Sequence, residues 1–169
     1  MGIEIREAGP ADVPLLMGMI RELAEYEKLA DEVQATEGLL HDALFGSPPA
    51  ASALIAELDG EPAGYAIFFA TFSTFLAIQG IWLEDIYVRP ARRKAGIGRA
   101  LLAGVAATLR ERGGQRLEWS ALDWNELALG FYRGLGAQAQ REWITHRLTG
   151  ESLEQLAGRA PAITRSPER

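Results

Sequence analysis

A cluster of positive charge lies near the middle of the chain, within a span of eleven residues that contains no acidic side chain. It consists of Arg89, Arg92, Arg93, Lys94 and Arg99. The chain as a whole carries a formal charge of −6, so this cluster reverses the sign locally. Gly96 and Gly98 lie inside it, directly before a stretch with helical periodicity. Glycines there let backbone N–H groups point at one ligand, and the helix dipole adds positive potential. The segment therefore predicts a site for an anionic, phosphate-bearing ligand, with a basic loop before an ordinary helix as the alternative.

The form of this loop is Arg-x-x-Gly-x-Gly, from Arg93 to Gly98. It is not the dinucleotide fingerprint, because Leu101 stands where the third glycine would be. It is not a phosphate-binding P-loop either, because no Gly-Lys-Ser/Thr ending follows.

Two adjacent carboxylates, Glu84 and Asp85, interrupt an otherwise apolar strand pattern over residues 80–88. Side chains alternate across a strand, so the two are expected on opposite faces, with at most one at a shared site. One carboxylate could serve as a general base. The alternative is that one faces solvent and the other forms an ion pair.

A tyrosine downstream has the right spacing for a second chemical role. Tyr132 follows Asn125 by seven residues, which places both on one face of a helix, two turns apart. A phenol has a pKa near 10 and can donate a proton in a dry pocket. The alternative is a core aromatic beside Phe131.

Composition limits the remaining chemistry. The absence of Cys excludes disulfides, thiolate metal sites and a thiol nucleophile. The two histidines, His41 and His146, lie far apart, so no metal site is expected. Acidic residues between Glu22 and Glu32 either solvate a helix end or attract a cation. The negative net charge argues against nucleic-acid or membrane partners. Without a long apolar run or a secretory signal, we expect a cytoplasmic protein.

The order of elements predicts a mixed α/β sheet with helices on both faces. Strands are expected at residues 3–7, 52–58, 63–71, 80–88, 116–122 and 138–148, and helices at 13–28, 36–46, 97–112 and 126–135. An Asp59–Gly60 turn joins the second and third strands as a hairpin.

These motifs together resemble the GNAT acetyltransferase superfamily, whose acetyl-CoA pyrophosphate loop has the form found at Arg93–Gly98. Leu83–Val88, Asp123–Glu126 and Phe131–Ala137 sharpen the resemblance. With Glu22–Glu27, they are similar to the diamine (spermidine/spermine) and thialysine N-acetyltransferase branch. The resemblance covers Ile3 to about Leu148. It implies the GNAT fold, with a mixed central sheet of about six to seven strands and helices on both faces. It also implies one acetyltransferase domain over residues 1–150. The Pro, Arg and Ser residues near the end of the chain predict a partly disordered tail over 151–169.

The resemblance also assigns roles to residues. It implies that Tyr132 is the general acid and that Glu84 is a carboxylate at the amine site. We expect Glu84 to act there as the catalytic base, through a water. It implies cofactor contacts at Ile86, Tyr87, Val88, Arg93, Lys94, Ala95, Gly96, Ile97, Gly98, Arg99, Asn125, Glu126, Leu127, Ala128 and Tyr132. It implies substrate contacts at Tyr26, Glu27, Glu84, Asp85, Glu118, Trp119 and Ser120. Many members have Gly at the position of Lys94, whose backbone is therefore expected to avoid a glycine-only conformation.

The expected function is transfer of an acetyl group from acetyl-CoA to the primary amine of a small cationic molecule. Candidate acceptors are a polyamine, a diamine or an amino acid resembling lysine or thialysine. Because Cys is absent, direct attack in a ternary complex is expected rather than a thioester intermediate on the enzyme. The alternatives are acetylation of a protein or peptide and a non-catalytic acyl-CoA sensor. The family resemblance further implies a homodimer.

Overall fold

A computed structural model describes residues 2–164 and divides the chain into two compact units. The first unit runs up to Ser120, and the second begins at Ala121. No helix in the described part of the chain is long and apolar enough to cross a membrane.

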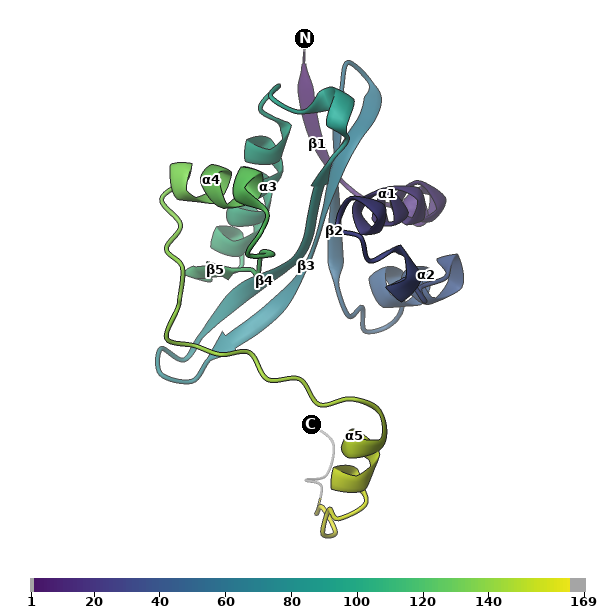
Figure 1. The fold of residues 1–169 in the computed structure, drawn as a ribbon, viewed down its shortest axis with the longest axis vertical. Helices are drawn as coiled ribbons and strands as arrows, with labels where there is room; N and C mark the ends of the chain where they lie inside the picture. The colour runs from purple at the N-terminus through teal and green to yellow at the C-terminus, as the bar shows by residue number, and fades with distance from the viewer. Residues whose placement is uncertain (1, 165–169) are drawn as a thin grey trace. The chain divides into compact units, whose positions relative to one another are not determined.

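The first unit is built on a five-stranded sheet (Figure 1). Its strands, in both spatial and chain order, are β1 (Ile3–Glu7), β2 (Ser52–Leu58), β3 (Glu61–Ser73), β4 (Ile78–Val88) and β5 (Arg116–Glu118). The first four pair antiparallel, whereas β5 runs parallel to β4. The predicted hairpin is confirmed: Asp59 and Gly60 both have positive φ, at 55° and 82°, which matches the twist of a two-residue turn.

Helices cover both faces of this sheet, as the sequence predicted (Figure 1). On one face lie α1 (Val13–Tyr26) and α2 (Glu37–Phe45), and on the other lies α3 (Ile97–Glu111). Short 3-10 turns at Pro10–Asp12, Ala30–Glu32 and Pro90–Arg92 connect these elements. The apolar residues that recur at helical spacing form the buried stripes of α1 and α3. From α1, Leu16 and Met19 pack against Tyr65 and Tyr87 of the sheet.

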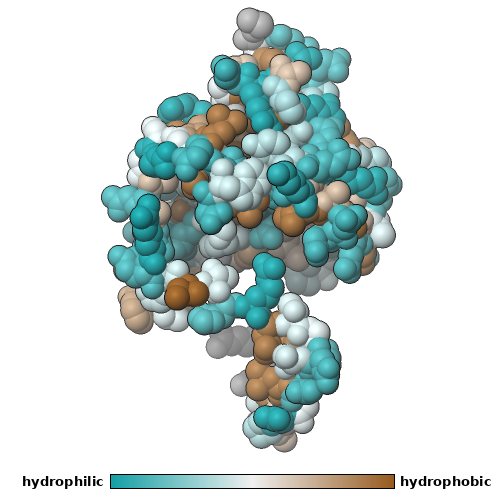
Figure 2. All heavy atoms as spheres, viewed as in Figure 1, coloured by the Kyte–Doolittle hydropathy of each residue, from teal (hydrophilic) through white to brown (hydrophobic). Residues whose placement is uncertain are grey.

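The second unit contains α4 (Glu126–Gly134) and α5 (Gly150–Ala157). Asn125 begins α4 as its N-cap: the Ala128 N–H donates to its side-chain oxygen at 3.2 Å. In α5, Leu153 and Leu156 are exposed, and Figure 2 shows apolar surface on this helix. Residues 165–169, part of the predicted disordered tail, lie outside the described residues.

The predicted final strand over residues 138–148 is wrong, since the structure has no strand there. The segment alternates polar and apolar residues, but a strand also needs the backbone of a neighbour to satisfy its N–H and C=O groups. Here Trp143 and Ile144 are exposed. The predicted strand at 116–122 is also shorter, because β5 pairs with β4 over three residues only. The expected six to seven strands are therefore five within residues 2–164.

Candidate active site

A β-bulge places the two carboxylates of β4. Asp85 pairs with Ile67 of β3, and the next pair is Leu83 with Phe68, so Glu84 is the extra residue. The bulge breaks the two-residue alternation of side chains. The prediction that Glu84 and Asp85 lie on opposite faces assumed regular alternation, which the bulge interrupts at Glu84, and the Glu84 charge acts on Asp85. Glu84 is exposed, and the Trp82 indole Nε1 donates to its Oε2 at 3.0 Å.

Asp85 is partly buried and has one hydrogen-bond donor from the sheet. The Tyr65 hydroxyl donates to its Oδ2 at 3.2 Å. Burial raises the pKa of Asp85 to about 6, mainly because the charged form loses solvation. The Tyr65 hydrogen bond opposes this rise, whereas the negative charges of Glu84 and Glu27 add to it. Asp85 is thus mostly ionised at neutral pH, which lies only about one pH unit above the pKa of its carboxyl.

The C-terminal end of α1 brings further predicted residues to this region. Glu27 is partly buried, and burial raises the pKa of its carboxyl. The neighbouring Tyr26 ring lies under the Arg93 guanidinium, 4.6 Å from its central carbon. The end of α1 therefore connects the carboxylates of β4 with the basic loop.

Glu22 ties the same helix to the end of β4. Its carboxylate accepts from the Tyr87 hydroxyl at 3.1 Å and from the Arg89 guanidinium, with the shortest contact at 3.1 Å. Burial, followed by the Glu22 contact, raises the pKa of Tyr87 to about 12. One of the five positive charges predicted to hold an anion is therefore paired with an acid of the protein.

The basic loop leads directly into α3. The Arg93 Nε donates to the Val88 carbonyl at 3.0 Å, which folds the loop back on the end of β4. Lys94 has a φ of 67°, so the expectation that its backbone would avoid the left-handed region is wrong. Gly96 is the N-cap of α3 with a φ of 89°, and no side chain caps this helix within the described residues. The N–H groups of the first turn lack intrahelical partners and can hold an anion.

The remaining predicted residues lie at β5 and in the second unit. Glu118 ends β5 and forms an ion pair with Arg116 at 2.7 Å, and Trp119 and Ser120 follow it. The N-cap and body of α4 contain five of them: Asn125, Glu126, Leu127, Ala128 and Tyr132. Phe131 packs beside Tyr132 with ring centroids 5.5 Å apart. Each unit thus brings one set of predicted residues together: the carboxylates and the basic loop in the first, Asn125 and Tyr132 in the second.

Two residues at the site were missed from the sequence. Tyr65 and Trp82 contact the paired carboxylates, but both lie in strands where aromatic residues are ordinary. For Tyr65 a signal existed, because a hydroxyl inside a nearly continuous apolar strand needs a hydrogen-bond partner. That partner was not visible without the register of β3 and β4.

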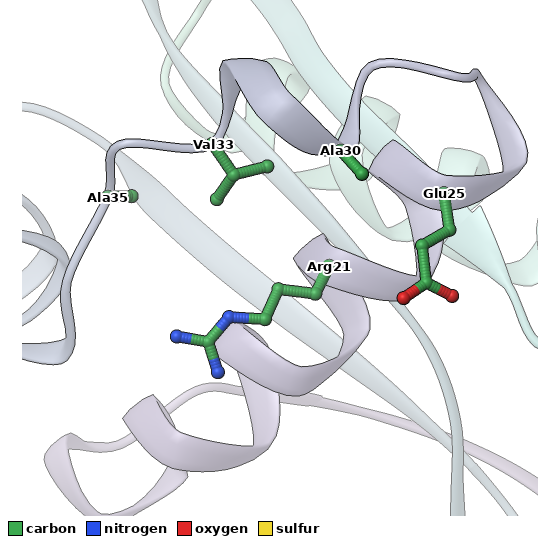
Figure 3. Close-up of a pocket in the computed structure, with 5 residues that line it drawn as sticks. All are labelled: Arg21, Glu25, Ala30, Val33 and Ala35. Carbon is green, nitrogen blue, oxygen red and sulfur yellow. The ribbon is translucent and has the colours of Figure 1, made fainter.

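A separate shallow pocket of about 220 Å³ lies beside α1 (Figure 3). It is lined by Arg21, Glu25, Ala30, Val33 and Ala35. Arg21 and Glu25 are one helical turn apart, so the pocket carries one positive and one negative side chain. Among residues 2–164, no three His, Cys, Asp or Glu side chains group as metal ligands.

Comparison with known proteins agrees with the resemblance found in the motifs. The family described as "Acetyltransferase (GNAT) family" matches residues 18–137. A thialysine N-epsilon-acetyltransferase of Bos taurus is 39% identical over 93% of this chain and 98% of its own length. An L-ornithine N5-acetyltransferase of Arabidopsis thaliana is 32% identical over 90% of this chain and 86% of its own.

A solved structure of similar fold is an integron cassette protein from the mobile metagenome of V. cholerae. It has a TM-score of 0.77 and 27% identity, and the match covers 93% of this chain and 98% of that one. The match over residues 18–137, together with full-length acetyltransferase relatives, means that the chain belongs to the GNAT acetyltransferase family.

Proposed function

We propose that this protein transfers the acetyl group of acetyl-CoA to the side-chain amine of a small cationic amino acid similar to thialysine, lysine or ornithine. The observation that carries the proposal is the group of carboxylates at the β4 bulge, beside a basic loop that opens α3. The names of the two relatives favour an amino acid over a polyamine. Acetyl-CoA supplies the activated acetyl thioester.

The acetyl donor is held along β4 and the loop. The backbone of Ile86 to Val88 holds the acetyl and pantetheine part, and residues Arg93 to Arg99 hold the pyrophosphate. The N–H groups at the start of α3 suit this anion, as does the surrounding positive charge. Asn125 and residues 126–128 contact the pantetheine arm. The proposed acetyltransferase domain comprises residues 1–150.

The acceptor amine is held by the acidic groups at the bulge. Tyr26, Glu27 and Asp85 contact the cationic acceptor, with residues 118–120 lining the other side. The amine must lose a proton before attack, which costs roughly 4–5 kcal/mol at neutral pH. Glu84 takes this proton through a water molecule. Its exposed position at the bulge suits a group that exchanges protons with solvent.

The leaving thiolate and the thioester oxygen need stabilisation of their own. Glu84 has no partner residue on β3, and we assign a backbone N–H at this bulge to the thioester oxygen. The Tyr132 hydroxyl donates its proton to the departing thiolate, and the second proton that the nitrogen loses as the amide forms returns to Tyr132. The enzyme acts in the cytoplasm as a homodimer. Light scattering tests the oligomeric state, and we expect a mass twice that of one chain.

Thiol release from acetyl-CoA tests this function directly. Because the chain has no Cys, a thiol-reactive dye gives almost no background from the protein. The acceptors are thialysine, lysine, ornithine, putrescine, spermidine, spermine and a basic peptide. We expect turnover with the cationic amino acids. Turnover with the peptide alone, or none while acetyl-CoA still raises the melting temperature, would overturn the proposal.

A single variant separates an enzyme from an acyl-CoA sensor. Tyr132→Phe removes only the hydroxyl, so we expect kcat to fall by about 100-fold or more. The rise in melting temperature with acetyl-CoA should stay the same. An unchanged kcat would remove Tyr132 from the mechanism.

A further inference from the structure

Tyr65 is a fully buried tyrosine whose hydroxyl meets a carboxylate rather than a backbone group. Its side chain has no exposed surface, and its ring packs near Tyr87, with centroids 6.2 Å apart. It lies in the apolar cluster that also contains Leu16, Met19 and Ile67. The ring is therefore held firmly from the α1 side of the sheet, and its hydroxyl has little freedom to move.

The register of the sheet explains why this hydroxyl reaches Asp85. Tyr65 lies two residues before Ile67 on β3, and Ile67 pairs with Asp85 across the bulge. The Tyr65 Oη and the Asp85 Oδ2 are 3.2 Å apart. Without the bulge, Ile67 would pair with Glu84, and the Asp85 side chain would lie on the face of the sheet opposite to Tyr65.

Asp85 also meets negative charge from two elements. Glu84 lies next to it on β4, and Glu27 approaches from the end of α1; both raise the pKa of Asp85, as burial does. The Tyr65 hydroxyl lowers it. Tyr65 is thus the group that keeps Asp85 ionised in an environment that otherwise favours its neutral form.

We propose that Tyr65 is a positioning residue for the acceptor amine: its hydroxyl fixes the Asp85 carboxylate at the bulge and preserves the negative charge that the cationic amine binds. The inference rests on the proposed function, in which Asp85 contacts the amine. Tyr65 itself contacts neither acceptor nor donor in this account. Its contribution belongs to amine binding, and therefore to KM more than to kcat.

Tyr65→Phe tests the inference, because it removes the hydroxyl and keeps the ring. Carbon-13 NMR of the Asp85 side-chain carboxyl gives its titration midpoint without any need for turnover. We expect the midpoint to rise by about one pH unit in Tyr65→Phe, the size of a charge-assisted hydrogen bond. Glu27→Gln serves as an opposite control, in which loss of a like charge should lower the midpoint. An unchanged midpoint in Tyr65→Phe would overturn the inference.

Kinetics provide a second readout that a merely structural role would not change. If Asp85 must be ionised, KM for the amine in Tyr65→Phe should rise roughly fivefold near pH 6 and approach the wild-type value near pH 8.5. In an Asp85→Asn background, the same substitution should have no further effect. A KM defect of equal size at every pH, or additive effects in the double variant, would refute the inference.

The activity of the wild-type protein distinguishes a failure of this inference from a failure of the proposed function. If wild-type protein acetylates an amine and Tyr65→Phe shows no pH-dependent defect, only the role of Tyr65 is wrong. If wild-type protein acetylates no amine in the panel, the proposed function is wrong and the inference falls with it.

Discussion

At the scale of the single residue, Asp85 shows a conflict between stability and function. A carboxylate in this environment is costly, because burial and two neighbouring acids all disfavour its charge. A neutral side chain of the same shape would suit the folded protein better. The cost is understandable if the charge is required to bind a cation.

This conflict predicts a stability effect that depends on pH. The folded-state pKa of Asp85 is raised to about 6 from 3.8, so the unfolded chain releases this proton first as pH rises. As pH rises from 3.8 to about 6, the free energy of unfolding therefore falls by about 3 kcal/mol in total. Asp85→Asn should raise the free energy of unfolding by up to ~3 kcal/mol at neutral pH, and by almost nothing below about pH 4.

Urea denaturation at several pH values measures this difference. The exposed Asp31→Asn serves as the control and should show no such trend. If the free energies of unfolding of Asp85→Asn and wild type differ by the same amount at every pH, the raised pKa of Asp85 would be contradicted.

Lys94 offers a second prediction, based on backbone conformation. A non-glycine residue at a φ of 67° costs about 1 kcal/mol relative to glycine. Lys94→Gly should therefore be more stable than Lys94→Ala by about 1 kcal/mol, although both remove the same charge. Thermal unfolding of the two variants measures this difference. Equal stability would mean that the loop adopts another conformation at this position.

At the scale of the element, β3 and β4 approach each other closely at Gly64. Gly64 pairs with Val88, and a Cβ at Gly64 would clash with the Tyr87 carbonyl. That carbonyl belongs to the stretch proposed to hold the acetyl and pantetheine part. The absence of a side chain at Gly64 thus supports both the pairing and the site.

Gly64→Ala should consequently destabilise the fold and disturb the site. We expect a loss of about 2 kcal/mol or more, because backbone atoms must move to admit the methyl group. Gly18→Ala is a matched control within α1, where nothing lies within 4 Å of the added Cβ. It should stabilise the helix by roughly 0.5–1 kcal/mol. Similar stabilities of the two variants would show that β3 and β4 do not approach so closely.

Some elements could be predicted from the sequence, and others could not. Helices α1 and α3 follow from apolar residues at helical spacing, and the hairpin from Asp59–Gly60, because these signals are local. The bulge at Glu84 could not be predicted, since it depends on the register between β3 and β4. The strand predicted at 138–148 failed for a related reason: alternation describes a face but does not supply a partner strand.

At the scale of the whole molecule, negative charge prevails, but one segment concentrates positive charge. The chain has 23 acidic and 17 basic residues, yet the loop before α3 is strongly basic. Within the first unit, carboxylates at the bulge and positive charge in the loop are joined through the Tyr26–Arg93 contact. This division suits an anionic donor and a cationic acceptor bound side by side. The family motifs could be found in the sequence, but the division into two units could not.

The division of charge predicts a specific effect of salt. In the proposed complex the loop attracts the phosphate groups of acetyl-CoA, and such an attraction is screened once the Debye length falls well below about 10 Å. We expect KM for acetyl-CoA to rise several-fold between low and high salt. A short acetyl thioester without phosphates is the matched control, and its KM should change little. Equal salt effects on both donors would contradict a role for the basic loop in binding phosphate.

The central claim is transfer of an acetyl group to the side-chain amine of a cationic amino acid, and identification of the product tests it most directly. Acetyl-CoA with a carbon-13 label in the acetyl group would be incubated with thialysine or ornithine, and the products examined by NMR. The account predicts one labelled amide, on the side-chain nitrogen, with the α-amine unmodified. A label found only on the α-nitrogen, or only as free acetate, would contradict it.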